Sequence, residues 1–335
     1  ELAASFAVDI LDYAVLSNHF HVILRNRPDI VAQWSDKEVA RRWWNLFPGR
    51  KDDRGRPAKP QPHELRAMTT NRKRIKELRK RLSHISWFMR CLAENIARRA
   101  NAEDDTSGRF WSGRFKCTRL LDTAALLACS IYVDLNPIRA GVARTPETSR
   151  YTSAYDRIRT LRSGNGRKKA GGKRRVAKQG DADAWLSPIQ LVESKSQSTR
   201  SPQQRASNRG FLPMTLADYL RVLDWTGRQV RRDKPGSIPE NLAPILERLK
   251  IVPRHWSDLV CQFGRWFATA AGSGETLEQE AIRRRRCWLH GSPRSRQVFR
   301  ETRDTIDNIH MTSPSRDPSL WPGPRPFHHA AWPTR

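Results

Sequence analysis

Two histidines separated by a single residue are the first feature of the sequence that could support catalysis. His19 and His21 flank Phe20 in a run of alternating side chains. Residues i and i+2 of an extended strand project from the same face, so both imidazoles can reach one cation. A half-buried strand in which the pair has no shared role explains the same spacing, and the spacing alone leaves both interpretations open.

A tyrosine far along the chain is the second candidate. Tyr132 lies near the end of an apolar segment that covers residues 122–135. A phenolic oxygen can attack a phosphodiester if a cation stabilises the negative charge that develops. Asn136 follows four residues later, so a regular helix would place its amide oxygen on the same side, although Pro137 makes that turn irregular. The ordinary alternative is a tyrosine packed in the core.

The charge of the chain restricts the partner that such a site would act on. The 335 residues include 62 Lys and Arg against 34 Asp and Glu, a net charge of +28. A positive charge of this size favours nucleic acid, because each cation on a phosphate releases a condensed counterion. The residues that we expect to contact nucleic acid are Arg72, Lys73, Lys76, Arg79, Lys80, Arg114, Lys116, Arg119 and Arg139.

The basic clusters also have plainer explanations. Residues 72–81 would form one charged face of a helix, which is equally a solvated surface. Further along the chain, Phe110, Trp111 and Phe115 alternate with cations, an arrangement that suits base stacking on single strands. The same aromatic residues could instead form a core that charges surround. The four arginines at 283–286 suit a phosphate contact or a solvated face equally well.

Composition excludes several classes of protein. The mean hydropathy is −0.72, and no apolar run approaches the roughly 18 residues that a membrane span needs. The five cysteines lie far apart and form no Cys-x-x-Cys pair, which argues against a disulfide framework or a zinc ribbon and suits a reducing cytosol. No signal peptide is recognisable, so we expect a cytoplasmic protein associated with the nucleoid. The chain begins at Glu1 rather than Met, and we expect it to be truncated at its N-terminus.

The elements that must position the histidines follow from periodicity and turn signals. Residues 9–16 and 19–25 are rich in apolar and β-branched side chains and predict an antiparallel hairpin. Ser35 with Glu38 forms a capping box that starts a helix. Residues 75–96 repeat apolar side chains at spacings of three and four, which predicts one amphipathic helix.

The tyrosine belongs to the next group of elements. Residues 109–116 suggest one or two short strands, and Asp122 caps a helix that ends at residue 135, before Pro137. This order of elements indicates the α+β class with an antiparallel sheet. Helices without clear strands are expected in the C-terminal part, at residues 216–230, 240–249, 255–271 and 275–290.

Changes in composition divide the chain into four parts. We expect a catalytic domain at residues 1–158 and a helical C-terminal domain at residues 211–300. Residues 159–210 are basic, Gly-rich and polar, and they predict a flexible linker because they cannot bury enough apolar surface. Residues 301–335 contain many prolines and no periodicity, which indicates a disordered tail.

Three segments of the sequence join these features. Residues 13–24 (YAVLSNHFHVIL) resemble the metal-binding strand of the His-hydrophobe-His single-strand endonucleases, and more closely that of the REP-associated tyrosine transposases. Residues 108–116 (GRFWSGRFK) and 132–141 (YVDLNPIRAG) match two other hallmark segments of this family, in the same order. The resemblance covers about residues 9–155, and residues 216–300 resemble a C-terminal extension found in a long subgroup.

The resemblance implies a fold and a reaction. The fold would be a ferredoxin-like antiparallel sheet with helices, in a family that normally has a further strand before Glu1. His19 and His21 would ligate Mg²⁺ or Mn²⁺, and Asn136 stands where relatives place a Gln or Asn near the metal. Tyr132 would attack a phosphate of single-stranded DNA, leaving a 5′-phosphotyrosine bond and a free 3′-OH. Reversal by another 3′-OH would transfer the strand without ATP.

We therefore expect a metal-dependent transposase that cuts and rejoins single-stranded or hairpin DNA, with no small-molecule substrate and no membrane partner. A homodimer is compatible with the sequence. The first alternative is a catalytically inactive protein, derived from such a transposase, that only binds DNA hairpins. The second is an unrelated basic RNA-binding protein, which would be indifferent to the loss of His19. Covalent capture of DNA would distinguish the first hypothesis from the other two.

Overall fold

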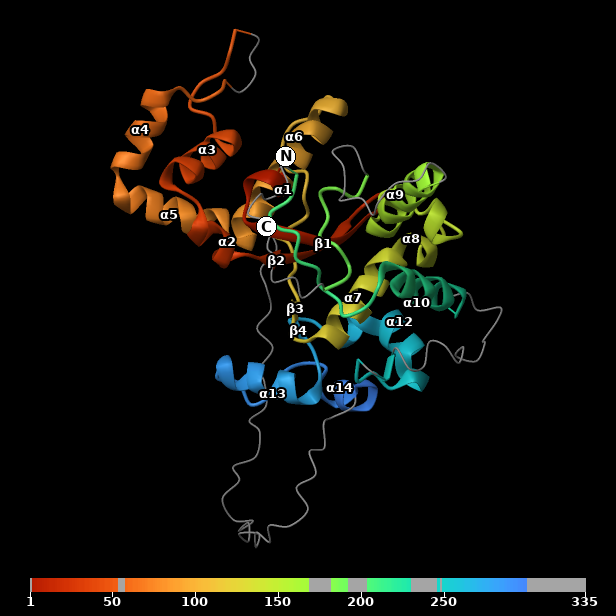
Figure 1. The fold of residues 1–335 in the computed structure, drawn as a ribbon. Helices are drawn as coiled ribbons and strands as arrows, with labels where there is room; N and C mark the ends of the chain where they lie inside the picture. Colours follow the sequence, from red (N-terminus) through yellow and green to blue (C-terminus); the bar gives the residue numbers. More distant parts are fainter. Residues whose placement is uncertain are drawn as a thin grey trace, which may run out of the picture. The chain divides into compact units, whose positions relative to one another are not determined.

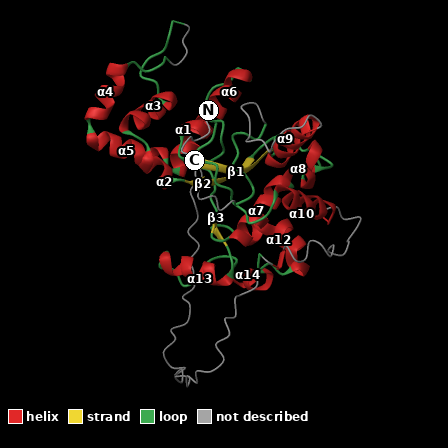
Figure 2. Ribbon diagram, in the orientation of Figure 1, coloured by secondary structure: helices red, strands yellow, loops and turns green. Residues whose placement is uncertain are grey.

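The computed structural model describes residues 2–53, 58–168, 182–191, 204–229, 246–247 and 249–299, with backbone only beyond residue 163 of the helix that ends at 168. These residues form an α+β fold dominated by helices (Figure 1, Figure 2), which confirms the expected class. No helix in this part of the chain is both long and apolar enough to cross a membrane.

The elements follow one another along the chain in two groups. The first group contains α1 (Leu2–Ser5), β1 (Val8–Val15), β2 (Phe20–Asn26), α2 (Pro28–Gln33), α3 (Asp36–Leu46), α4 (Pro62–Thr70), α5 (Arg72–Leu82), α6 (Ile85–Glu103), β3 (Arg119–Leu120), α7 (Thr123–Asp134), α8 (Asn136–Arg139), η1 (Pro146–Thr148) and α9 (Ser153–Lys168). The second group contains α10 (Leu216–Gln229), η2 (Pro253–His255), α12 (Trp256–Trp266), β4 (Ala270–Ala271), α13 (Gly274–Arg283) and α14 (Ser292–Val298).

The antiparallel hairpin of β1 and β2 confirms the prediction from the sequence. Its register places Ala14 opposite His21. The two faces of the hairpin pack against different helices, because side chains alternate along each strand. Ile23 belongs to a core that includes α7, whereas Phe20 and Val22 lie against a second core that includes α6. This alternation turns His21 toward α7, which contacts β2.

Helix α7 joins both ends of the described chain. It packs against β1 and β2 on one side and against α10 and α12 on the other (Figure 1). Residues on several sides of α7 are fully buried, including Ala125, Ala128 and Ile131, as expected of a helix enclosed on all sides. Tyr219 of α10 and Trp256 of α12 belong to the same core. We expected a separate domain at residues 211–300, and side chains from its described part share this core with α7.

Local capping signals predicted two helix starts correctly. The Glu38 backbone N–H donates to Ser35 Oγ at 3.2 Å, and α3 begins directly after this residue. The Ala125 backbone N–H donates to Asp122 Oδ1 at 2.9 Å at the start of α7. Each of these side chains satisfies a backbone donor that has no partner within the helix.

The single helix expected over residues 75–96 is wrong. The chain forms α5 and α6, separated by Ser83 and His84. The Ser83 hydroxyl donates to carbonyl groups of the preceding turn, and His84 Nδ1 accepts from the Ser86 backbone N–H. Such local side-chain bonds compete with helical hydrogen bonds. Apolar residues keep their spacing of three and four across the break, because α5 and α6 each bury an apolar face in the same core.

The strands expected at residues 109–116 are also wrong, because the chain is irregular there. The Arg109 guanidinium donates to the carbonyl oxygens of Trp111 at 2.8 Å and Ser112 at 2.6 Å. The Trp111 indole N–H donates to the carbonyl oxygen of Ala93 at 2.9 Å. The Arg109 side chain thus occupies two carbonyl groups that a strand would have offered to a neighbour, and the Trp111 indole is fixed to α6. The next strand, β3, pairs in parallel with β4.

The C-terminal helices agree with the predictions in part. Helix α10 matches the helix expected at residues 216–230. The helix expected at 255–271 ends early, at Trp266, because residues 270–271 form β4 beside β3. The helix expected at 275–290 is α13, which ends at Arg283. The helix expected at 240–249 lies mostly outside the described residues, and the tail 301–335 lies wholly outside them.

Residues 182–191, within the range that we expected as a flexible linker, pack against the hairpin. The Ser187 backbone N–H donates to the carbonyl oxygen of Ile10 at 2.8 Å. Leu186 and Ile189 are buried. The prediction of a linker rested on the average composition of residues 159–210, which is polar. That average gave no weight to these two apolar side chains. Residues 169–181 and 192–203 of the expected linker lie outside the described residues.

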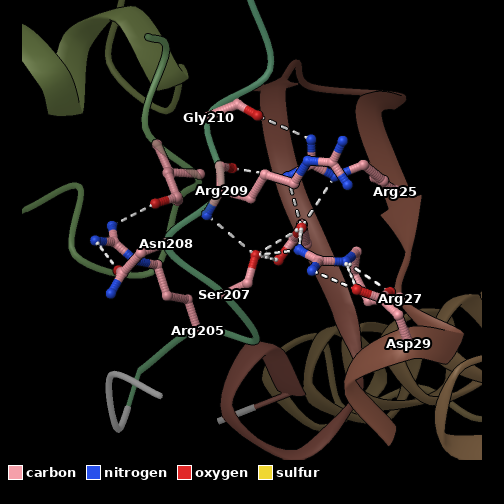
Figure 3. Close-up of polar contacts among 10 residues, drawn as sticks. Arg25, Arg27, Asp29, Arg205, Ser207, Asn208, Arg209 and Gly210 are labelled. Atoms are coloured by element: carbon pink, nitrogen blue, oxygen red, sulfur yellow. Dashed lines mark hydrogen bonds and ion pairs between the residues drawn. The ribbon is translucent and has the colours of Figure 1, made fainter. Parts of the chain in front are cut away.

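Residues 204–210, which we call the strap, are held by a buried carboxylate of the hairpin. Asp9 is 1% exposed. Its side chain accepts hydrogen bonds from Arg25 Nη2 at 2.7 Å, Arg27 Nη1 at 3.0 Å and Ser207 Oγ at 2.8 Å. Arg25 Nη1 also donates to the carbonyl oxygen of Gly210 at 3.0 Å (Figure 3). The strap thus completes a hydrogen-bond network that the hairpin alone would leave unsatisfied.

The strap network predicts a large loss of stability when Asp9 is neutralised. Asp9→Asn leaves two arginines without their shared buried anion, and we expect the free energy of unfolding to fall by about 3–5 kcal/mol. Asp29 also pairs with Arg27, but its side chain is 53% exposed, so Asp29→Asn should cost less than about 1 kcal/mol. Urea denaturation of both variants measures the difference. Equal losses would contradict the central role of Asp9.

Candidate active site

The histidine pair stands at the start of β2, directly after the hairpin turn. Strand alternation places the two rings side by side, with centroids 5.0 Å apart and planes at 89°. His19 is exposed, and His21 is half-buried. His19 Nδ1 lies 2.6 Å from Asn18 Oδ1. A bond donated from Nδ1 to this oxygen orients the ring and leaves Nε2 as the atom that can bind a ligand.

Tyr132 lies opposite the histidines, on the last turns of α7. Its ring centroid is 5.6 Å from that of His21, at an interplanar angle of 76°. Asn136 follows at the start of α8, and its Nδ2 donates to the carbonyl oxygen of Tyr132 at 3.0 Å. This bond uses the amide nitrogen and leaves the amide oxygen to act as a ligand. A strand and a helix that are distant in sequence thus bring an imidazole and a phenol together.

The electrostatic environment of His21 favours the neutral imidazole. Burial lowers the pKa of His21 to about 4, and the nearby His19 and Arg139 contribute in the same direction. The Nε2 atom of His21 is buried and has no hydrogen-bond partner among the described residues. A buried polar atom without a partner costs about 1–3 kcal/mol. A cation bound to Nε2 would satisfy it.

The donor atoms present fit a divalent cation. The two imidazoles of His19 and His21 supply nitrogen. The Asn136 amide oxygen, on the turn that follows Tyr132, is the candidate oxygen donor, because its amide nitrogen is the atom that bonds to the Tyr132 carbonyl group. Within the described ranges, no third His, Cys, Asp or Glu joins them. Such an incomplete donor set would leave positions for water or phosphate oxygens, as a catalytic site requires.

A pair of buried carboxylates ties the end of α7 to its neighbours. Asp134 and Asp12 of β1 are both fully buried. The Tyr219 hydroxyl donates to Asp134 Oδ2 at 2.7 Å and lies 3.2 Å from Asp12 Oδ2. Ser153 Oγ donates to Asp134 Oδ1 at 2.7 Å. Burial and the neighbouring Asp134 raise the pKa of Asp12, because a buried negative charge loses its hydration and is repelled by a second carboxylate nearby.

Two of the other tyrosines, Tyr13 and Tyr219, differ from Tyr132 in the partners of their hydroxyl groups. The Tyr13 hydroxyl donates to Asp156 Oδ2 at 2.8 Å, and Tyr219 donates to Asp134. Burial and these carboxylates raise the pKa of both phenols above the ordinary value. A phenol that donates to a buried carboxylate resists becoming a phenolate. Tyr132 instead faces an imidazole.

The C-terminal part supplies neighbours of Tyr132 that sequence reasoning missed. The ring of Phe263 on α12 lies 5.9 Å from the Tyr132 ring, centroid to centroid. The Arg139 guanidinium carbon lies 4.9 Å from the centroid of Tyr132. Arg139 Nη2 donates to the carbonyl oxygen of Cys261 at 2.6 Å. Arg139, expected as a nucleic-acid contact, is therefore also a link between α8 and α12. No local pattern pairs Phe263 with Tyr132 or Cys261 with Arg139, because more than a hundred positions separate the members of each pair.

Several of the expected nucleic-acid contacts are exposed on α5. Arg72, Lys73, Lys76 and Lys80 are exposed. Arg79 differs, because its Nη1 donates to a backbone carbonyl group of α2 at 2.6 Å and its Nη2 pairs with an acidic side chain of α3 at 2.7 Å. We assign Arg79 to the packing of α5 against these helices.

The cations after residue 113 also divide into two groups. Arg114 and Lys116 are exposed. Arg119 is also exposed, at 53% of its side chain, but it forms an ion pair with Glu280 of α13 at 3.1 Å. Glu280 is 4% exposed and also pairs with Arg283 and Arg284. Hydrogen bonds from Arg283 and the other arginines lower the pKa of Glu280 to about 2. Part of the arginine run at 283–286 therefore serves an internal anion.

A cavity of about 720 Å³ adjoins the histidine pair. Its aromatic lining includes Phe20 and Trp111, whose centroids lie 5.6 Å apart, and Tyr13 and Trp185, whose centroids lie 4.9 Å apart. His19 and His21 are also in its wall. We call it the aromatic cavity. Its volume falls in the range of about 300–1,000 Å³ that is typical of ligand pockets.

No family model, no curated protein and no solved structure matches this chain.

The pKa of His21 predicts a pH-dependent stability. Between pH 6.5 and pH 4 the unfolded chain binds a proton at this position that the folded chain does not. Acidification through this window should therefore lower the free energy of unfolding. A proton NMR titration in EDTA, with the His21 resonance assigned by its loss in His21→Ala, should give a midpoint near pH 4. A midpoint near 6.5 would contradict the buried environment of this imidazole.

Proposed function

We propose that this chain is a metal-dependent tyrosine transposase of the REP-associated type, which cuts and rejoins single-stranded or hairpin DNA in the nucleoid. The observation that carries the proposal is the approach of Tyr132 to His21, at 5.6 Å between ring centroids. The resemblance in the sequence requires these two residues to share a site. Nothing in their separate segments places them together, so their proximity is independent support.

The proposed reaction exchanges one phosphate ester for another. The Tyr132 oxygen forms a bond to phosphorus while the bond to the 3′-oxygen breaks. The phenol loses a proton to solvent, and the departing 3′-oxygen takes one up. The product is a 5′-phosphotyrosine bond and a free 3′-OH, and attack by another 3′-OH reverses the step.

The residues of the site have distinct roles in this proposal. His19, His21 and Asn136 would hold Mg²⁺ or Mn²⁺, which supplies Lewis-acid stabilisation of the phosphate when it is bound. The low pKa of His21 keeps its imidazole neutral and able to ligate. The Arg139 guanidinium beside the Tyr132 ring adds positive charge where negative charge develops.

The substrate contacts follow from the exposed cations and the aromatic cavity. Lysines and arginines of α5, with Arg114 and Lys116, would follow the phosphate backbone. Bases of a single strand would stack on Trp111 and its aromatic neighbours, because stacking requires no base pairing partner. This combination favours single-stranded DNA over a regular duplex, whose bases are already stacked.

The finer fold belongs to the same proposal. The described residues contain the two-stranded antiparallel sheet of β1 and β2, with Ala14 bridged to Thr152 at its edge. A ferredoxin-like sheet would add strands beside this hairpin. We propose that residues 1–158 carry the chemistry and that residues 211–300 extend the site.

Replacement of the Tyr132 hydroxyl tests the proposal directly. Tyr132→Phe removes only the nucleophilic oxygen, so we expect no covalent adduct with labelled single-stranded DNA in Mn²⁺ and nearly unchanged DNA affinity. Tyr151→Phe is the matched control, because Tyr151 is 68% exposed and should form the adduct at the wild-type rate. A denaturing gel resolves the adduct, and EDTA should abolish it.

The alternative functions give different results in the same assay. Binding of hairpin DNA with no adduct from the wild-type chain would support an inactive DNA-binding protein. Preference for RNA, unaffected by His19→Ala, would support an RNA-binding protein. An adduct that survives Tyr132→Phe would assign the nucleophile to another tyrosine.

Base stacking in the aromatic cavity gives a second prediction. Trp111→Leu keeps an apolar side chain but removes the stacking surface, and one stacked base contributes about 1–3 kcal/mol. The Kd for single-stranded DNA should therefore rise by about 5- to 150-fold. Trp288, which is 68% exposed, provides the control variant Trp288→Leu, which should bind as the wild type does. Fluorescence anisotropy measures both, and equal effects would exclude the cavity as the base-binding surface.

A further inference from the structure

A glycine of α12 lies against the hydroxyl group of Tyr132. Gly264 is exposed and occupies the last turns of α12. A Cβ atom at this position would lie 3.0 Å from Tyr132 Oη and 3.5 Å from its Cζ. The first of these distances is tighter than about nine in ten contacts of real Cβ atoms, so a side chain at 264 requires the Tyr132 hydroxyl to give way by a few tenths of an ångström.

Glycine is an unfavourable residue at this position, because it lies inside a helix. Glycine inside a helix is less favourable than alanine by about 1 kcal/mol. The apolar stripe of α12 is otherwise regular, with Trp256, Leu259, Val260 and Phe263 buried. An exposed glycine in such a helix has no packing reason of its own. The neighbour that would meet a side chain at this position is the Tyr132 phenol.

Helix α12 is held firmly enough to define the position of the phenol. Arg139 Nη2 donates to the carbonyl oxygen of Cys261, one turn before Gly264. The Trp256 indole N–H donates to Thr226 Oγ1 of α10 at 2.8 Å. Tyr132 therefore lies between His21 on one side and α12 on the other.

We propose that Gly264 is a positioning residue of the tyrosine site, where the absence of a side chain gives the Tyr132 hydroxyl room to reach a phosphodiester of single-stranded DNA. The proposal rests on the function proposed above and extends it, because it makes the C-terminal part a wall of the site. Tyr132 Oη is the far end of a flexible side chain, so it can yield to a methyl group at little cost to folding. The loss should therefore appear in the reaction and not in stability.

The test compares two glycines that both face α7. Gly227 lies on α10, where a Cβ would meet Leu135 Cδ2 at 3.2 Å and would not touch Tyr132. Single-turnover adduct formation at saturating DNA should slow by about 10-fold in Gly264→Ala and about 100-fold in Gly264→Val, since small misplacements of a reacting atom cost rates of this order. Gly227→Ala should keep the wild-type rate. DNA affinity should be unchanged in all three variants.

Two further measurements separate positioning from damage to the fold. The Tm of Gly264→Ala should equal or exceed that of the wild type, because alanine favours the helix. Nitration of Tyr132 by tetranitromethane, quantified by mass spectrometry, should slow in Gly264→Val while nitration of Tyr151 stays constant. This second readout does not depend on cleavage.

The outcomes distinguish this proposal from the function on which it rests. A wild-type chain that forms no adduct overturns the proposed function. A wild-type adduct through Tyr132 that forms equally fast in both Gly264 variants overturns the positioning role and leaves the function standing. An equal loss of rate in Gly227→Ala also overturns it, because the effect would then reflect the general packing of α7.

Discussion

The buried pair Asp12 and Asp134 is the interaction on which the candidate site depends. It connects β1 of the hairpin to the last turn of α7, and Tyr219 and Ser153 join it from α10 and α9. Two carboxylates in such a place are costly unless they share donors and at least one is neutralised. Hydrogen bonds from Tyr219 and Ser153 therefore hold the C-terminal end of α7 in place beside the hairpin. That end carries Tyr132.

The consequence is a site assembled from both ends of the described chain. The histidines come from the hairpin, the phenol from α7, and the wall beside the phenol from α12. The Asp9 network with the strap is a second tie between the same two regions. A C-terminal part that shares buried polar contacts with the hairpin is poorly described as an accessory domain, because its removal would expose unsatisfied groups next to the site.

The charge of the chain divides into two uses. Exposed cations on α5 remain directed to solvent, where phosphate can reach them. Arg79 and Arg119 instead pair with carboxylates of neighbouring elements, and Glu280 gathers three arginines around one buried anion. A net charge of +28 therefore overstates the surface available to nucleic acid. The exposed cations of α5, together with Arg114 and Lys116, are therefore better candidates for phosphate contacts than Arg79 and Arg119 are.

Features that depend on near neighbours could be predicted from the order of the amino acids. The hairpin, the cap of α3 at Ser35 and the cap of α7 at Asp122 follow from alternation and from side chains within a few residues. The sequence also singled out the histidines and Tyr132 as candidates, through their spacing and a resemblance to a family.

Features that depend on distant partners became visible only in the folded chain. The fold packs residues 182–191 on β1 and places Gly264 against Tyr132. A periodic pattern shows which face of an element is buried but not what covers it. The covering surface comes from segments far away in the chain, and whether a strand forms, an arginine is free or a glycine is needed depends on that surface.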